Sequence, residues 1–443
     1  MTTTTSDQQH ELHVRKRRNL TWVVALGFFG LVFDGYDLVV YGTVLPGFLS
    51  DPSRIGPLTP AQGGVLGSYA LVGVLVGALL TGTVSDVLGR RRLMLLAYAW
   101  FAAAMGFTAL AGSATTLGIG RFAAGLGIGA LLATTGALVA EYAPPGRKNL
   151  FNALTYSGIA FGSTLSALLA ILLLDSIGWR GMFLLGALPL VTLFPLAVVK
   201  LPESAAWLQA RGRHEEAEAL AARTGIVLTD DQAASAAGQE ETTGTGRSGF
   251  AGLFSGGNAA PALLLGFTSV CCLLLVYALN TWLPELMGRA GFSTKGSLSF
   301  LLVLNGSAVV GQLIGSRLAD RFGPKPVVAT AFLLGAVAIG LLTVQAPLGV
   351  LLLFVAVAGV GTSGTQTLIY GFVANHFRTT VRGAAVAWCA GFGRLGGIGG
   401  PLLGGLLIGA GLALNSTFFV LAALALVGSV LTLLVPRTVR GGR

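Results

Sequence analysis

The sequence predicts an all-helical membrane protein in which twelve transmembrane helices form two six-helix bundles of the same orientation. Three observations support this: composition, apolar stretches of spanning length, and an internal repeat. Hydrophobic residues make up 53% of the 443 residues and charged residues only 10%, against about 25% charged in an ordinary soluble domain. This composition excludes a soluble enzyme, a disordered chain and a disulfide-rich secreted domain. At about 20 apolar residues per span, the chain has room for roughly a dozen helices.

The N-terminal bundle is expected over residues 20–200, after a polar tail at 1–19 that ends near four consecutive basic residues. The apolar run that follows is longer than the core of a cleavable signal, so it is interpreted as a retained first span. The six expected spans are 20–49, 62–85, 93–112, 115–141, 151–174 and 180–200.

A polar central loop at 201–258 separates the bundles and holds eight of the eighteen acidic residues. Its first part, Pro202 to Arg223, is predicted to be helical, and its Thr-, Ser- and Gly-rich remainder to be a flexible linker. The C-terminal bundle is expected over 259–436, followed by a tail at 437–443. Its spans are expected at 261–286, 297–320, 326–345, 347–374, 383–410 and 415–435.

The basic residues predict the orientation of the chain in the membrane. With both termini in the cytoplasm, most of the 28 Lys and Arg residues fall on cytoplasmic tails and loops, as the positive-inside rule requires. Only four fall on outside loops: Arg54, Arg180, Arg289 and Lys295. The net charge of +10 therefore reflects topology and a lipid bilayer, and no nucleic-acid partner is expected.

An internal repeat links the two halves. The stretch Gly82–Arg92 carries an Asp, a Gly and basic residues that recur in Gly315–Lys325, and the Asp residues and the following Gly residues are each 234 positions apart. Each copy follows the second span of its half. An Asp there can cap a helix or pair with an Arg, and Gly permits a tight turn. The predicted gating residues are Gly82, Asp86, Gly89, Arg90, Asp320 and Gly323. Such a parallel repeat indicates a transporter with its site between the halves.

Two acids interrupt the first span. Asp34 and Asp37 lie three residues apart and share a helix face with Tyr41. Because an ionisable group at membrane depth costs about 2.5–3.5 kcal/mol, each is a functional candidate. Two close carboxylates cannot both ionise cheaply in a low dielectric, so at least one is expected to hold a proton, as a proton carrier must. The alternative is a pair neutralised by an Arg for packing.

Two arginines lie inside later spans. Small residues around Arg121 in the fourth span allow close helix approach, so this Arg can reach an acid on the first span. Arg394 in the eleventh span presents a fixed charged fork that suits a carboxylate substrate. The alternative for Arg394 is a permanent ion pair, with Glu285 as the main rival partner.

Weaker candidates include Glu141, at the inner end of the fourth span, which could act in proton coupling or gating. Pairing with Arg147 or Lys148 is the alternative. Several aromatic and amide side chains could line a substrate cavity or serve only in helix packing: Tyr41, Tyr156, Tyr277, Asn280, Trp282, Gln366 and Tyr370. The chain shows no nucleophile–base set and no metal-ligand spacing, so neither an enzyme, a metal nor a cofactor is expected.

Several stretches resemble one transporter family. The duplicated loop and the twelve-span plan resemble the major facilitator superfamily along essentially the whole chain. Within it, the setting of the two acids resembles the aromatic acid:proton symporter family, and the end of that stretch, Tyr41–Pro46, is similar to benzoate transporters. The matching stretches are Phe33–Pro46, Gly178–Phe183, Leu201–Ser204 and Gly393–Pro401.

This resemblance implies a monomer in the bacterial inner membrane that imports an aromatic carboxylate together with protons by alternating access. Benzoate is the favoured substrate. A hydroxybenzoate, protocatechuate, gentisate or another small organic anion is the alternative, and a membrane sensor or passive channel is a remote one. In such a family the acids matching Asp34 and Asp37 are essential, and the residues matching Arg121, Glu141 and Arg394 are implicated.

Overall fold

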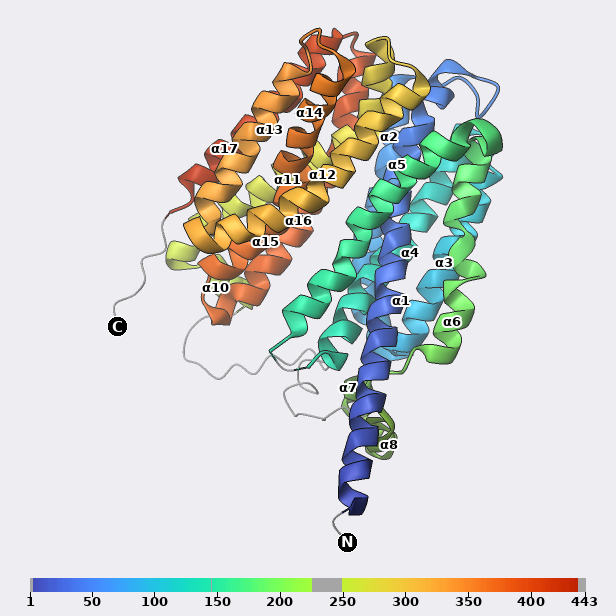
Figure 1. The fold of residues 1–443 in the computed structure, drawn as a ribbon, viewed down its shortest axis with the longest axis vertical. Coiled ribbons are helices and arrows are strands. Elements are labelled where there is room, and N and C mark those ends of the chain that lie inside the picture. Colours follow the sequence, from blue (N-terminus) through green and yellow to red (C-terminus); the bar gives the residue numbers. More distant parts are fainter. Residues whose placement is uncertain (1–2, 145, 225–248, 437–443) are drawn as a thin grey trace.

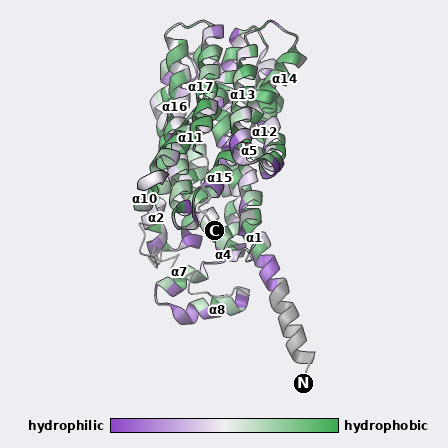
Figure 2. Ribbon diagram, turned by 90° about the vertical axis from the view of Figure 1, so that its left-hand side faces the viewer, coloured by the Kyte–Doolittle hydropathy of each residue, from purple (hydrophilic) through white to green (hydrophobic). Residues whose placement is uncertain are grey.

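The computed structural model describes residues 3–144, 146–224 and 249–436, and every regular element in these ranges is a helix. The helices form two bundles side by side, with both chain ends emerging from the lower end of their bundles in Figure 1. Apolar residues cover most of the helices, while hydrophilic residues stand out on the part of the first helix that follows the grey stretch and on two short helices near it (Figure 2). The predicted all-helical fold in two bundles is confirmed.

The N-terminal bundle contains the first five predicted spans within a few residues of their expected bounds at most ends. The first helix is the exception, because it starts well upstream in the polar tail. The helices are α1 (Thr3–Ser50), α2 (Pro60–Leu88), α3 (Arg90–Ala109), α4 (Ala114–Tyr142), α5 (Lys148–Gly186) and α6 (Leu193–Lys200). The backbone leaves helical geometry at Gly178, with φ 65° and ψ −178°, which lies between the fifth and sixth predicted spans. The sixth predicted span is interrupted by a 3₁₀ turn at Leu188–Leu190, which precedes α6.

The central loop begins with two helices packed under the N-terminal bundle, α7 (Ala205–Ala210) and α8 (His214–Thr224). They confirm the helical prediction for its first part, with a break at Gly212, where φ is +71°. The expected linker falls mostly on 225–248, outside the described residues. The chain resumes with the short helix α10 (Gly249–Leu253) and a 3₁₀ turn at Gly256–Asn258.

The C-terminal bundle repeats the plan of the first. Its helices are α11 (Ala259–Arg289), α12 (Thr294–Phe322), α13 (Pro324–Leu341), α14 (Leu348–Gly359), α15 (Thr365–His376), α16 (Thr379–Gly409) and α17 (Leu414–Leu434). The tenth predicted span is α14 and α15 joined by a π-helical turn at Val360–Gly364. Among the described residues, ten helical segments are long and apolar enough to cross a membrane. The 31-residue α16 and the broken sixth span supply the other two of the twelve predicted spans.

The duplicated loop has the same backbone geometry in both halves. Gly89 joins α2 to α3 with φ 86° and ψ 155°, and Gly323 joins α12 to α13 with φ 88° and ψ 151°. These angles fall in a region essentially restricted to glycine. The predicted tight turns are therefore confirmed. The second copy has one more residue than the first between its opening Gly and its Asp (Gly315–Asp320 against Gly82–Asp86), and this does not alter the turn.

Replacing Gly323 by alanine is expected to lower the free energy of unfolding by about 1–3 kcal/mol. The cause is backbone strain alone, because no atom lies within 4 Å of the added Cβ. Thermal unfolding of the purified protein in detergent measures this loss of stability. Gly82→Ala is the matched control, since Gly82 lies inside α2 and its added Cβ also meets nothing within 4 Å. Equal unfolding temperatures for the two variants would contradict the prediction.

The bundles contact each other closely at the end away from the termini. There α2 packs on α16, with the backbone of Gly64 against that of Pro401. The Ser68 hydroxyl donates a hydrogen bond of 2.7 Å to the carbonyl oxygen of Ile398. Residues without bulky side chains let the two backbones approach. This contact seals one end of the space between the bundles.

Candidate functional site

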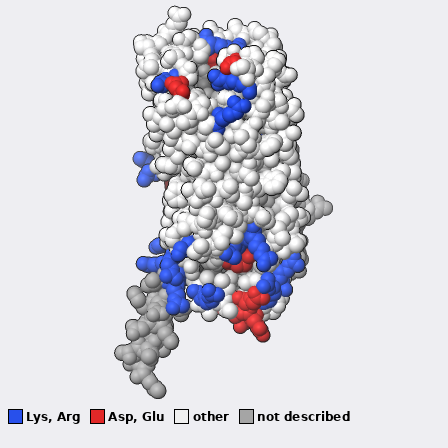
Figure 3. Space-filling model, turned by 90° about the vertical axis from the view of Figure 1, so that its right-hand side faces the viewer, with Lys and Arg blue, Asp and Glu red and all other residues white. Residues whose placement is uncertain are grey.

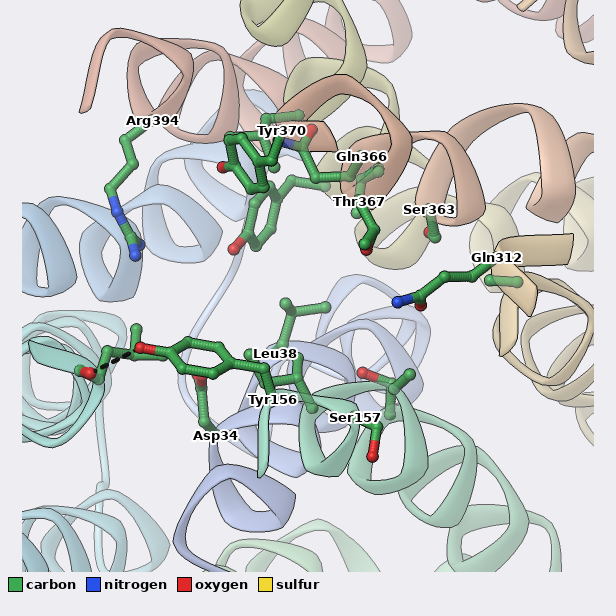
Figure 4. A pocket seen from close by; sticks show the side chains of 18 of the residues that line it. Asp34, Leu38, Tyr156, Ser157, Gln312, Ser363, Gln366, Thr367, Tyr370 and Arg394 are labelled. Atoms are coloured by element: carbon green, nitrogen blue, oxygen red, sulfur yellow. Dashed lines mark hydrogen bonds between the residues drawn. The ribbon is translucent and has the colours of Figure 1, made fainter. Parts of the chain in front are cut away.

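A cavity of about 1000 Å³ lies between the two bundles. Its walls come from α1, α4 and α5 on one side and from α11, α12, α15 and α16 on the other (Figure 4). It reaches Asp320, Pro324 and Asn375, near the ends of α12, α13 and α15 that lie toward the termini. Eleven predicted site residues line it: Asp34, Asp37, Tyr41, Arg121, Tyr156, Tyr277, Asn280, Asp320, Gln366, Tyr370 and Arg394.

A buried ion pair joins α1 to α4 in the wall of the cavity. Arg121 Nη1 donates to the Asp37 carboxylate and, at 3.3 Å, to the Asp37 carbonyl oxygen, and both side chains are 3% exposed. The guanidinium also lies 5.2 Å from the centre of the Tyr41 ring, within cation–π range. The predicted contact between Arg121 and an acid of the first span is confirmed.

Glycines on α4 explain how Arg121 reaches α1. Gly125 and Gly129 face the backbone of α2, and Gly127 faces Phe101 of α3. These contacts pack α4 against both neighbours and leave the Arg121 side chain directed at α1. A larger residue at any of the three positions would push the helices apart.

Arg394 lies on the wall of the cavity opposite the Arg121–Asp37 ion pair. It extends from α16 into the cavity, and Asp34 lies across from it on α1 (Figure 4). Arg394 is half-buried and has no ion-pair partner among the described residues. The rival partner Glu285 instead accepts a hydrogen bond of 2.7 Å from Arg289. The permanent-pair alternative is therefore wrong for Glu285, and the guanidinium is available to an anion.

Tyrosine rings line the space between these charges. Tyr156, Tyr277 and Tyr370 come from α5, α11 and α15, so both bundles contribute. The Tyr156 hydroxyl donates to the Leu132 carbonyl oxygen at 2.9 Å (Figure 4), and that of Tyr41 to Gly63 at 2.6 Å. The hydroxyls of Tyr156 and Tyr41 are thus engaged, and the tyrosine rings of the lining offer flat apolar faces.

Comparison with known proteins shows which family this chain belongs to. The family model described as "Sugar (and other) transporter" matches residues 22–440. The chain belongs to this transporter family. The prediction that the chain is a transport protein and not an enzyme is confirmed. Its predicted membership of the major facilitator superfamily is also confirmed.

Relatives match along nearly the whole transporter. The benzoate transport protein of Acinetobacter baylyi is 32% identical over 422 residues, covering 93% of this chain and 89% of that protein. The gentisate transporter of Corynebacterium glutamicum is also 32% identical, with coverage of 92% and 85%. The predicted resemblance to aromatic acid transporters is confirmed.

A solved structure supports the fold. The xylose transporter XylE from E. coli, in a partially occluded inward-open conformation, matches with a TM-score of 0.75 and 18% identity. The match covers 96% of this chain and 99% of that one.

Uncharged polar residues that the sequence analysis missed line one side of the transporter's cavity. Gln312, Ser363 and Thr367 gather away from Arg394, with Ser157 facing them from α5 (Figure 4). Ser363 Oγ and Gln366 Oε1 are buried without a hydrogen-bond partner among the described residues. The one signal that could have found Ser363 is the glycine-rich stretch around it, which forms the π turn at Val360–Gly364; such turns occur often at functional sites.

Among the predicted proton-coupling and substrate-binding residues, two lie outside this cavity lining. Trp282 is 1% exposed, and its indole N–H donates to the Pro401 carbonyl oxygen at 2.9 Å, so it packs α11 against α16. Glu141 accepts hydrogen bonds from Ser204 Oγ at 2.6 Å and from the Ala206 N–H at 3.0 Å. The expectation that Trp282 contacts the cavity is therefore wrong. The hydrogen bonds of Glu141 hold the start of α7 against α4.

The gating candidates of the first half also contact α4 or the central loop. The ion-pair partner of Glu141 is Arg90, at 3.2 Å. The alternative pairing of Glu141 with Arg147 or Lys148 is therefore wrong. The carbonyl oxygen of Asp86, rather than its carboxylate, accepts hydrogen bonds from Trp207 and Arg211. Of the six candidates, Asp320 is the one that lines the cavity.

Proposed function

We propose that this transporter imports an aromatic carboxylate together with protons across the bacterial inner membrane by alternating access. The observation that carries the proposal is Arg394, a half-buried cation without an ion-pair partner in the described residues, facing Asp34 across a tyrosine-lined cavity. Relatives named for benzoate, gentisate and 4-hydroxybenzoate support the substrate class. Benzoate is the first substrate to test.

In this proposal Arg394 holds the carboxylate through a forked pair of charge-assisted hydrogen bonds. The rings of Tyr156, Tyr277 and Tyr370 pack against the aromatic ring of the substrate. Benzoate is an anion at neutral pH, because carboxylic acids of this kind have a pKa near that of Glu, about 4.3. The carboxylate of the substrate thus neutralises the positive charge that Arg394 presents to the cavity.

Asp34 and Asp37 bind the proton, and Arg121 controls when the Asp37 carboxylate is free to do so. A bare buried charge opposes reorientation of the bundles, so movement is cheap only when anion and proton are both bound or both absent. One anion with one proton is electroneutral. The pH gradient alone then drives import, whereas a second proton adds about 2.3 kcal/mol per 100 mV of membrane potential.

The proposed orientation places both termini in the cytoplasm, so the cavity opens inward and the Ser68–Ile398 contact closes the outside. The charges support it. Figure 3 shows charged residues at both ends of a broad, nearly uncharged band, and most of the described Lys and Arg residues belong to segments at the end that carries the N-terminus, as expected for a cytoplasmic face. The Gly89 and Gly323 loops then flank the inner gate. A single chain contains both halves, so the proposed working unit is a monomer.

Uptake of radiolabelled benzoate into proteoliposomes with acid outside tests the function. Free benzoic acid crosses lipid unaided, so protein-free liposomes run alongside. We expect pH-driven accumulation above that control, with competition by hydroxybenzoates. Equilibration without accumulation would indicate a passive channel, and absence of any flux for every aromatic acid would favour a sensor.

The polar side of the cavity is expected to contact ring substituents. Gln312→Leu should lower uptake of 4-hydroxybenzoate about tenfold relative to benzoate, since one hydrogen bond contributes about 1–1.5 kcal/mol. Competition against labelled benzoate measures the ratio. Ser299→Ala on the same helix is the control, because its hydroxyl bonds to the Lys295 carbonyl oxygen outside the cavity. An unchanged ratio in Gln312→Leu would refute the contact.

A further inference from the structure

A second cavity, of about 790 Å³, lies outside the transport site. It is at the end of the N-terminal bundle that carries the N-terminus, where α1, the end of α6 and α8 meet the start of α3. Its basic lining residues are Arg15, Arg18, Arg91, Lys200 and Arg223, and its acidic lining residue is Glu203. The cavity therefore carries a surplus of positive charge that the transport mechanism does not use.

The contacts of Glu203 and Arg91 leave the positive charges of Arg18, Lys200 and Arg223 in place. The Glu203 carboxylate already accepts hydrogen bonds from the backbone N–H groups of Arg91 at 2.9 Å and Ser204 at 3.0 Å. The Arg91 guanidinium bonds to the carbonyl oxygens of Val198 at 2.6 Å and Leu201 at 2.7 Å. Carbonyl groups position the guanidinium without cancelling its charge, so the cavity favours an anion.

The rim of the cavity is apolar on the side of α6. Val199 lines the cavity there and is 74% exposed. Its neighbour Val198 is 41% exposed, and the residues of α6 before Lys200 are all apolar. Beside them, Lys200 Nζ lies 5.5 Å from the centre of the Trp22 ring. A Trp and a Lys at the end of a lipid-facing apolar surface mark the membrane–water interface. The cavity thus combines a cationic floor with direct access from the hydrocarbon region.

We propose that this cavity binds the headgroup of an anionic phospholipid, with the phosphate on Arg18, Lys200 and Arg223 and the acyl chains along Val198 and Val199. Phosphate esters are the shared chemistry of a lipid headgroup and a free phosphate, and the apolar rim favours the lipid. Basic pockets between helices on this side of a membrane protein suit such headgroups. Because Arg18 belongs to α1 and Arg223 to α8, the lipid ties the central loop to the bundle.

Titration of the full-length protein in detergent with phosphatidylglycerol, read by native mass spectrometry and thermal unfolding, tests the site. We expect saturable binding and a rise in unfolding temperature, neither seen with phosphatidylcholine. The variant R18Q/K200Q/R223Q should bind about 100-fold more weakly, since each basic residue near an anionic headgroup contributes about a factor of five. Arg378→Gln/Arg382→Gln, at the start of α16 in the other bundle, is the matched control.

The single variant Lys200→Gln, expected to weaken binding about fivefold, serves if the triple variant fails to fold. A parallel titration with inorganic phosphate separates the two sources of the anion. An equal effect of inorganic phosphate would overturn the lipid assignment in favour of a soluble anion. Equal phosphatidylglycerol binding by the triple variant and the control would overturn the site itself.

Discussion

Asp37→Asn is expected to abolish pH-driven uptake and to destabilise the protein. The substitution removes a proposed proton-binding group and leaves the Arg121 charge buried without its partner. Breaking a buried ion pair on one side costs about 3–5 kcal/mol, and both side chains here are 3% exposed. Initial rates in proteoliposomes and unfolding temperatures in detergent measure the two effects on the same preparation.

The double variant Asp37→Asn/Arg121→Gln separates stability from transport. It replaces the ion pair by two neutral amides, so no charge remains buried and most of the lost stability should return. Uptake should stay at the level of protein-free liposomes, because the Asp37 carboxylate is still missing. Restored accumulation in this variant would show that Asp37 serves packing alone.

Arg394→Gln is expected to weaken benzoate binding about 100-fold with little change in stability. A hydrogen bond to a charged group contributes about 1.5–3 kcal/mol, and 1.4 kcal/mol corresponds to a factor of ten. Stability should change little because Arg394 has no ion-pair partner in the described part of the chain. Calorimetric titration of the purified protein with benzoate measures the dissociation constant.

Two further variants sharpen this result. Arg394→Lys keeps the charge without the planar fork, so its affinity should fall between those of the wild type and Arg394→Gln. Arg289→Gln removes a cation that pairs with Glu285 away from the cavity, and it should bind benzoate normally. Equal affinity of Arg394→Gln and Arg289→Gln would exclude Arg394 from substrate binding.

The charged members of the site could be predicted from sequence because charge in an apolar span is costly and therefore rare. This applied to Asp34, Asp37, Arg121 and Arg394, all of which line the cavity. Gln312 and Ser363 gave no comparable signal, since an isolated uncharged polar residue is tolerated in a helix bundle. Their importance depends on which way each helix is rotated, and hydropathy does not record rotation.

Partners distant in sequence explain the wrong expectations. The nearby bases Arg147 and Lys148 were the natural partners for Glu141, yet the pair forms with Arg90, 51 positions earlier. Trp282 was expected in the cavity, but its indole N–H donates to the carbonyl oxygen of Pro401, 119 positions later in α16.

The fold itself was predictable to the level of spans, because hydropathy averages over about 20 residues. The same averaging hides changes of backbone geometry that involve only a few residues. The 3₁₀ turn at Leu188–Leu190 and the π turn at Val360–Gly364 each depend on a few backbone angles. Both lie in spans whose composition remained apolar, so neither altered the predicted pattern.

The matching turns at Gly89 and Gly323 bear on the ancestry of the molecule. They agree with the repeat in the sequence, yet the offset of 234 that relates the two copies carries Arg121 to Val355 and Arg394 back to Ala160. The turns recur in both halves, whereas these two arginines do not. Each half has consequently specialised, and neither retains the chemistry to work as a symmetric pair with a copy of itself. A homodimer built from either half should therefore fold without transporting.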